Sequence, residues 1–227
     1  MTEQDAGFAI IPSVLSDARS LALLAAVTGS TLPRSKAGAR NALTNPAASA
    51  IAGDSRLLQI ASDALGGTAF PFKATLFEKS QRANWLVVWH QDTALPLRAR
   101  REVAGWGPWS IKAGVVYAHA PAAALARVVA LRVHLDDSTP ENGPLRVLPG
   151  THRLGVLTDS QLQQLSRTRS SVECIVAKGG VVMMRPLLVH SSSKASGIAP
   201  RRVLHIEYAT SRDLGDALEL GVARATR

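Results

Sequence analysis

The sequence predicts a mainly β protein of the α+β type, an antiparallel jelly-roll with N-terminal helices packed on the sheet. Two observations predict this fold class. Helical patterns occupy roughly the first third of the chain, and many short strand-like runs separated by turn clusters fill the rest. All-β barrels of 227 residues often fold as one unit. We therefore expect a single domain over residues 1–227, with a helical part at about 13–67 and a jelly-roll core at about 70–210.

Two helices are expected before the strands begin. Ser16 is a suitable N-cap for a helix over 17–28 that Gly29 would end. A second helix is predicted over 54–65, with a glycine pair after it. The polar stretch 30–45 between them is interpreted as a loop able to cover a site.

The strands follow in order from residue 70. Alternating or continuous apolar runs predict them, and clusters rich in proline, glycine and asparagine separate them. A short helix is expected over about 159–166, and a segment of this length at 93–112 is typical of a functional lid or insertion. The expected strands are 70–79, 85–89, 128–135 and 145–148, with three or four more within 171–210.

The charge and the cysteine content of the chain limit its possible partners and cellular compartments. The formal charge is +9 with a pI near 10.6, from twenty arginines and six lysines. The arginines are scattered, which favours a solvated surface, with attraction of an anionic substrate as the next interpretation. Cys174 is the only cysteine, so neither an intrachain disulfide nor a thiolate cluster can form. This cysteine usage fits a reducing cytosol, so we expect a cytoplasmic protein. We expect no membrane span, because no apolar run is long enough.

His90 and Asp92 form the strongest chemical signal in the chain. They follow the apolar run 85–89, and on an extended backbone residues i and i+2 point to the same side. A metal centre with two histidines and one carboxylate needs a third ligand, and His190, which closes a second apolar run, is the best placed. The remaining histidines are interpreted as structural: His119, His134, His152 and His205.

Arg201 lies eleven residues after His190 and opens another strand-like run. A guanidinium group binds carboxylates through two parallel hydrogen bonds. Arg201 is therefore a candidate to hold a carboxylate beside the metal.

Five stretches, in this order, resemble the phytanoyl-CoA dioxygenase family of iron(II)- and 2-oxoglutarate-dependent oxygenases, which are built on a double-stranded β-helix. Together they span most of residues 70–210. The chain departs from the family pattern in the arginine- and tryptophan-rich insertion 95–110 and in Val203, where serine or threonine often follows the arginine. The matching stretches are 84–92, 131–137, 142–152, 184–192 and 201–202.

The resemblance implies the cofactor chemistry and assigns residues to it. It implies that His90, Asp92 and His190 bind iron(II) and are catalytic. It also implies that Arg201 holds the distal carboxylate of 2-oxoglutarate, the co-substrate used with O2. Arg132 and Lys73 are further candidates for the co-substrate pocket.

The function implied is hydroxylation of a small molecule with release of succinate and CO2. Asp92 argues against halogenation, which needs a small residue at the carboxylate position. One alternative is a nucleic-acid demethylase of the same chemistry, for which the basic stretch 98–101 near Trp106 and Trp109 is the only hint. Another is a non-catalytic β-helix binding module. We expect a small-molecule substrate and no nucleic-acid partner; neither the substrate nor the oligomeric state can be read from the sequence.

Overall fold

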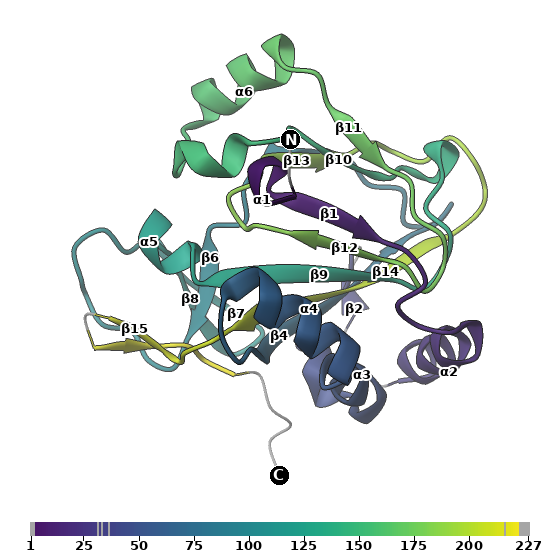
Figure 1. Cartoon of the computed structure of the whole chain (residues 1–227), viewed down its shortest axis with the longest axis horizontal. Coiled ribbons are helices and arrows are strands. Elements are labelled where there is room, and N and C mark those ends of the chain that lie inside the picture. The colour runs from purple at the N-terminus through teal and green to yellow at the C-terminus, as the bar shows by residue number, and fades with distance from the viewer. Residues whose placement is uncertain (1–2, 31, 33, 36, 216, 223–227) are drawn as a thin grey trace.

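Two facing antiparallel sheets form the framework of the chain, with the N-terminal helices packed on the larger sheet and a later helix packed on the smaller one (Figure 1). This computed structural model describes residues 3–30, 32, 34–35, 37–215 and 217–222. The larger sheet has seven strands in the order β1-β12-β9-β14-β4-β3-β2, and the smaller has four in the order β11-β10-β13-β5. The predicted fold class, a mainly β jelly-roll with helices on the sheet, is confirmed.

The strands have the following bounds. The larger sheet contains β1 (Phe8–Ile11), β12 (Val181–Met184), β9 (Val128–His134), β14 (Arg201–Ala209), β4 (Phe70–Lys79), β3 (Gly38–Ala39) and β2 (Arg34–Ser35). The smaller contains β11 (Val172–Cys174), β10 (Leu145–Val147), β13 (His190–Ser192) and β5 (Val87–His90). A three-stranded sheet contains β6 (Ala94–Leu97), β8 (Val115–His119) and β7 (Trp109–Lys112), and a hairpin contains β15 (Asp213–Gly215) and β16 (Leu218–Glu219).

Capping side chains mark the starts of the longer helices. Helix α2 spans Asp17–Thr28, and the Ser16 side chain accepts a hydrogen bond from the Arg19 amide at its start. Asp54 caps α4 in the same way, and a reciprocal capping box opens α6. The remaining bounds are α1 (Glu3–Ala6), α3 (Pro46–Ala52), α4 (Ser55–Leu65), α5 (Ala122–Leu125) and α6 (Asp159–Thr168), with 3-10 turns at Ala42–Thr44, Pro140–Asn142 and Thr151–Leu154.

The two faces of the larger sheet have opposite character. On the outer face Leu76, Leu204 and Val133 lie opposite one another on β4, β14 and β9 and pack against the helices in the main apolar cluster. Because side chains alternate along a strand, the other set faces the smaller sheet. On β4 and β14 that set is mostly polar, with one apolar pair, Phe77 and Val203. It consists of Lys73, Thr75, Phe77 and Lys79, opposite Glu207, His205, Val203 and Arg201.

Three segments differ from expectation. The strand predicted at 85–89 is displaced to Val87–His90. The segment 93–112 does not form a loop throughout, because β6 and β7 both pair with β8. The stretch 30–45 is likewise not a plain loop: β2 and β3 extend the larger sheet, although residues 31, 33 and 36 lie outside the described part.

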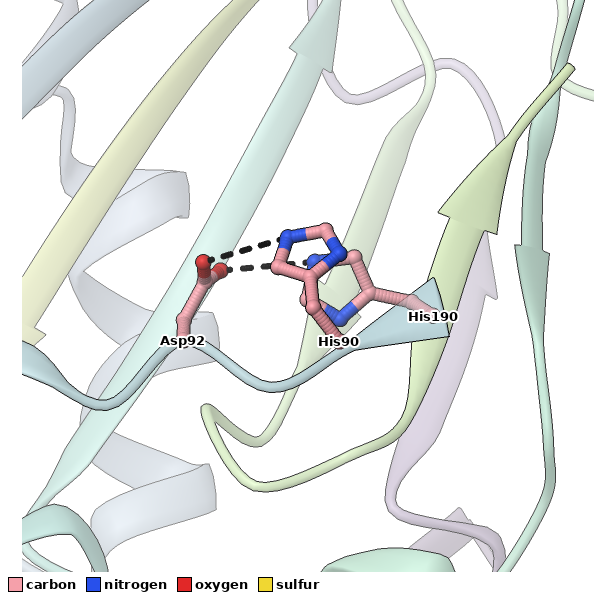
Figure 2. A group of neighbouring side chains, drawn as sticks. All are labelled: His90, Asp92 and His190. Atoms are coloured by element: carbon pink, nitrogen blue, oxygen red, sulfur yellow. Dashed lines mark ion pairs between the residues drawn. The ribbon is translucent and has the colours of Figure 1, made fainter. Parts of the chain in front are cut away.

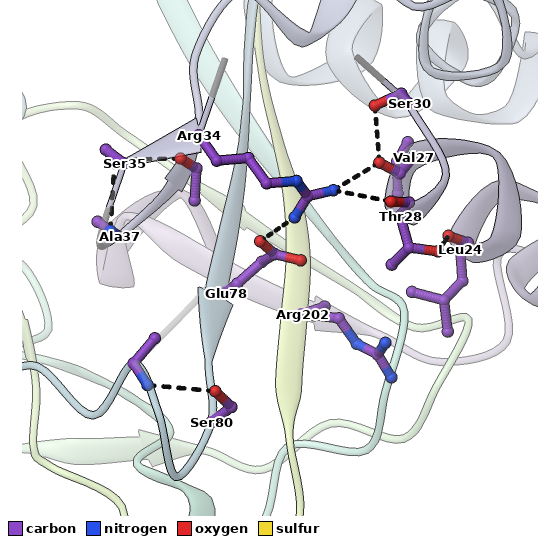
Figure 3. A network of polar contacts seen from close by, with 12 residues as sticks. Leu24, Val27, Thr28, Ser30, Arg34, Ser35, Ala37, Glu78, Ser80 and Arg202 are labelled. Atoms are coloured by element: carbon purple, nitrogen blue, oxygen red, sulfur yellow. Dashed lines mark hydrogen bonds and ion pairs between the residues drawn. The ribbon is translucent and has the colours of Figure 1, made fainter. Parts of the chain in front are cut away.

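Arg34 anchors this extension to the rest of the fold (Figure 3). Its guanidinium group donates to the Val27 carbonyl at 2.7 Å, at the C-terminal end of α2, and pairs with Glu78 on β4. A cation at a helix C-terminus also interacts favourably with the helix dipole. Among the helices that the structure describes, none is long and apolar enough to cross a membrane.

Candidate metal centre

The ligand atoms of His90, Asp92 and His190 all lie within 4.8 Å of one another (Figure 2). The Nε2 atom of His90 lies 3.8 Å from one oxygen of Asp92, and the Nε2 atom of His190 lies 3.6 Å from the other. The two rings lie 4.2 Å apart between centroids. Two imidazole nitrogens and one carboxylate oxygen converging on one point form a donor set suited to a divalent iron centre with open positions.

Strand pairing brings the two histidines together across 100 residues of sequence. His90 ends β5, His190 begins β13, and the two are direct partners in the antiparallel register. Past the end of β5, the Asp92 amide donates to the Pro186 carbonyl at 2.9 Å. Gln91 also fixes this turn. Its side-chain amide group donates hydrogen bonds to the carbonyls of Gly155 and Leu187, at 2.9 and 2.7 Å. The Asp92 side chain is thereby held against the histidine pair.

Each histidine is oriented by the backbone two residues before it. The Nδ1 atom of His90 lies 2.8 Å from the Val88 carbonyl, and that of His190 lies 2.8 Å from the Leu188 carbonyl. A carbonyl oxygen only accepts, so Nδ1 carries the proton in both rings and Nε2 keeps its lone pair for a metal. This is the supporting arrangement that metal-binding histidines commonly have.

The protonation states of His190 and Asp92 also suit a metal. Burial lowers the pKa of His190 to about 3, an effect that Asp92 opposes only in part, so the ring is neutral at pH 7. For Asp92, burial raises the pKa, but His190, His205 and His90 lower it more, and its pKa lies well below the ordinary value. Both groups are in the form that binds a cation.

Three buried cations lie beside this centre without an acidic partner among the described residues. Lys79 and Arg201, paired in register on β4 and β14, both donate to the Ser192 hydroxyl, at 2.7 and 3.2 Å. Burial first, and then Arg201 and Arg132, lower the pKa of Lys79 to about 8. Burial and then Arg132 lower the pKa of Arg201 in the same direction. Buried charge of one sign calls for a counter-ion.

Arg132 completes the cation cluster from β9. Its Nη1 atom lies 3.1 Å from the Nδ1 atom of His205, and its guanidinium group lies 5.5 Å from the centre of the Phe77 ring. Its Nε atom is buried and has no hydrogen-bond partner. An unpaired buried donor in an undercompensated cationic pocket fits a bound carboxylate such as that of 2-oxoglutarate.

Lys73, the other lysine predicted for the pocket, has a different environment. Its Nζ atom pairs with Glu207 at 2.6 Å and lies 5.6 Å from the centre of the Tyr117 ring. It lines a cavity of about 250 Å³ that also contains Asp92, Phe77 and Tyr117. The structure therefore brings Arg201 and Arg132 together with Lys79. Lys73 does not join this cluster and instead lines the cavity that contains Asp92.

Sequence reasoning missed Lys79, Arg40 and Lys112. Lys79 could have been found, because it lies six residues after Lys73 on one strand and so shares its face. Arg40 and Lys112 line the cavity from segments distant in sequence, and no spacing signal links them. In the described structure no tryptophan lines this cavity; Trp106 is buried in an apolar cluster, and the Trp85 ring centre lies 5.2 Å from the Nζ atom of Lys79.

A match to the phytanoyl-CoA dioxygenase family covers residues 4–203. The L-proline trans-4-hydroxylase of Streptomyces griseoviridis is 27% identical over 180 residues, which cover 67% of this chain and 59% of that protein. The chain thus matches less than two thirds of the length of this relative.

Two solved structures illustrate the similarity of fold. The non-heme alpha ketoglutarate dependent epimerase SnoN from nogalamycin biosynthesis has a TM-score of 0.67 at 20% identity, over 95% of this chain and 84% of its own. HygX from Streptomyces hygroscopicus, with nickel and 2-oxoglutarate bound, has a TM-score of 0.64 at 16% identity, over 91% of this chain and 84% of its own. At these identities the likeness shows a shared fold.

Proposed function

The chain belongs to the phytanoyl-CoA dioxygenase family, and from that premise we propose that residues 1–227 form one iron(II)- and 2-oxoglutarate-dependent dioxygenase domain that hydroxylates a small molecule. The observation that carries the proposal is the convergence of His90, Asp92 and His190, with both histidines oriented through Nδ1. In this proposal these three residues hold iron(II). When bound, iron(II) would supply the oxidising chemistry, in which the substrate, 2-oxoglutarate and O2 give the hydroxylated substrate, succinate and CO2.

We propose that Arg201 and Lys79 bind the distal carboxylate of 2-oxoglutarate. Their shared contact with Ser192 and their lack of an acidic partner among the described residues support this assignment. Arg132 is assigned to the same pocket, because its buried Nε atom lacks a partner. The three cations orient the co-substrate toward the metal ligands and offset its negative charge. Lys73 remains a weaker candidate, since Glu207 already neutralises it.

The substrate is proposed to lie in the cavity beside Asp92, between the larger sheet and β8. The described lining combines charged side chains with Phe77 and Tyr117, as small-molecule sites commonly do. The name of the Streptomyces relative makes L-proline the first compound to assay. A cytoplasmic location is also proposed, on the sole cysteine, Cys174, which is buried and free.

The alternatives have less support. For nucleic-acid demethylation, the basic stretch 98–101 would have to face a groove with aromatic side chains. Arg98 instead pairs with Glu219 and Arg100 pairs with Glu102, and Trp106 is buried. A non-catalytic binding module would have no need of an intact ligand set.

Succinate release tests the proposed function directly. Purified protein with iron(II), ascorbate and 2-oxoglutarate in air is expected to form succinate slowly alone and faster with a substrate. His190→Ala is expected to abolish both rates, and His134→Ala, which changes a histidine outside the ligand set, is the control for loss of a buried imidazole. No succinate above the His190→Ala background, with iron bound, would contradict the proposal.

A further inference from the structure

Two cations in the cavity have no acidic partner in the described part of the chain. Arg40 follows β3, Lys112 ends β7, and both line the cavity that contains Asp92. The Nζ atom of Lys112 lies over the Tyr117 ring, 5.4 Å from its centre. The third cation, Lys73, is already paired with Glu207. Arg40 and Lys112 therefore leave the cavity with uncompensated positive charge.

The fold holds these two side chains in one place although 72 residues separate them in sequence. Asn41, next to Arg40, donates to the Ala113 carbonyl at 3.5 Å, which joins the segment after β3 to the turn after β7. Upstream, Arg34 fixes the same segment to α2 and to Glu78 (Figure 3). The segment is thus attached on both sides of Arg40, which limits the entropy lost when a ligand orders it.

Arg40 and Lys112 lie between two hollows. They line the inner cavity, and they also line a second hollow of about 530 Å³ that includes Leu32 and Thr44. The pKa of Lys112 lies below its ordinary value, because of burial first and then the charges of Arg40 and Lys73. The three cations are therefore close enough to repel one another, and an anion among them would relieve that repulsion.

We propose that Arg40 and Lys112 bind an anionic group of the substrate, which makes the substrate a small organic acid, either a carboxylate or a phosphate. This inference rests on the proposed function. The co-substrate has its own cations in Arg201 and Lys79, so a second anion site beside Asp92 is free for the substrate. Binding its anionic group between the hollows places the rest of the molecule in the inner cavity, next to the metal ligands. Guanidinium and ammonium groups both bind carboxylate and phosphate oxygens.

Calorimetry under nitrogen tests this assignment. The protein, with iron(II) and saturating 2-oxoglutarate, is titrated with acetate, L-proline and inorganic phosphate, and with acetamide as a neutral counterpart of acetate. Saturating 2-oxoglutarate keeps Arg201 and Lys79 occupied. The variants are Arg40→Met, Lys112→Met and Lys112→Arg, which keeps the charge. Arg167→Met removes the same charge from an exposed position on α6 and is the matched control.

We expect at least one anion to bind and acetamide not to bind. Affinity should fall about tenfold or more in Arg40→Met and Lys112→Met, and be largely retained in Lys112→Arg and Arg167→Met. The anionic group of the substrate is identified as carboxylate or phosphate by whichever of the two classes of titrant binds with the higher affinity. Absence of anion binding, or binding that neither methionine variant weakens, would overturn the inference.

The same samples separate this inference from the proposed function. Anion binding that depends on Arg40 and Lys112, in a protein that forms no coloured iron and 2-oxoglutarate complex, would support the anion site and contradict the oxygenase. A coloured complex in a protein whose anion binding is unchanged in Arg40→Met and Lys112→Met would support the oxygenase and contradict the anion site.

Discussion

Lys79 and Arg201 donate to one hydroxyl group, that of Ser192, at 2.7 and 3.2 Å. Both side chains are buried, and neither has a carboxylate partner among the described residues. Ser192 cannot neutralise either charge, because a hydroxyl group is uncharged; it accepts from both cations and donates its own proton to the Gly143 carbonyl at 2.8 Å. The pair is thus organised for an anion, and this arrangement leads to the first three predictions.

Lys79→Met should weaken co-substrate binding and stabilise the ligand-free protein. The affinity for 2-oxoglutarate is expected to fall about 10- to 100-fold, because a charged hydrogen-bond donor is lost. The free energy of unfolding without ligand should rise by about 1 kcal/mol or more, because a buried charge beside Arg201 and Arg132 is removed. Calorimetry and urea unfolding measure the two effects. Lys194→Met, at an exposed position, is the control, and its 2-oxoglutarate affinity and free energy of unfolding should change little. A Lys79→Met protein that is less stable than the unchanged protein would contradict this account.

Co-substrate affinity should decrease as the pH rises through about 8. Burial and neighbouring cations lower the pKa of Lys79 from 10.5 to about 8, so above pH 8 binding of an anion must take up a proton. By the same linkage the unfolded chain holds more protons between about pH 8 and 10.5, so this lysine makes the ligand-free fold more stable as pH rises across that window. Titrations from about pH 7 to about 9.5 measure the affinity. An unchanged slope in Lys79→Met would assign the effect to another group.

Gly143→Ala should be far more harmful than Gly105→Ala. Both glycines have positive φ, +69° and +82°, so both substitutions introduce backbone strain of about 1 kcal/mol. A Cβ at Gly143 would also lie 2.4 Å from the Ser193 carbonyl and 3.0 Å from the Lys79 Nζ, whereas Gly105 has open space. Thermal unfolding should separate the two variants clearly, and 2-oxoglutarate affinity should fall only in Gly143→Ala. Equal losses in both would show that crowding near Lys79 is unimportant.

Gln91→Ala should loosen the metal centre without removing a ligand. Gln91 bonds the carbonyls of Gly155 and Leu187 and accepts from the Leu157 amide at 2.8 Å. Loss of these bonds should cost about 2 kcal/mol or more of unfolding free energy and about tenfold in metal affinity, as for other residues that support ligands. Chemical unfolding and cobalt(II) titration measure these losses. Gln163→Ala, on the exposed side of α6, should change neither quantity.

The sequence predicted most of the fold because local signals agree with it. Ser16 caps a helix where expected, the helix predicted over 54–65 forms at Ser55–Leu65, and the run at 70–79 alternates between two faces that the sheet does separate. The segment 93–112 was harder, because β6 and β7 are defined by pairing with β8 and not by their own pattern. Pairing between distant segments leaves no local period to detect.

The candidate site divides along the same line. His90 and Asp92 are two residues apart, and this spacing is the local signal that pointed to the pair. In the structure Asp92 lies past the end of β5, where its backbone amide donates to the Pro186 carbonyl. Arg40 and Lys112 line the same cavity from segments far apart in sequence, which Asn41 joins through its bond to the turn after β7, so their proximity belongs to tertiary structure. Lys73 was a candidate for the co-substrate pocket through the family resemblance alone, and no sequence signal indicates its partner Glu207, which lies on the neighbouring strand β14.

The central claim is that the three ligands and Arg201 build one site for iron(II) and 2-oxoglutarate. Anaerobic titration of the metal-free protein, monitored by the weak visible charge-transfer band of the chelate, tests it most directly. The band should form with both components, disappear in His190→Ala and require much more 2-oxoglutarate in Arg201→Met. Arg202→Met is the matched control. Arg202 is the next residue along the chain, and it forms an ion pair of 2.7 Å with Asp136, outside the proposed site. No band in the unchanged protein, or a band as strong in His190→Ala, would contradict the account.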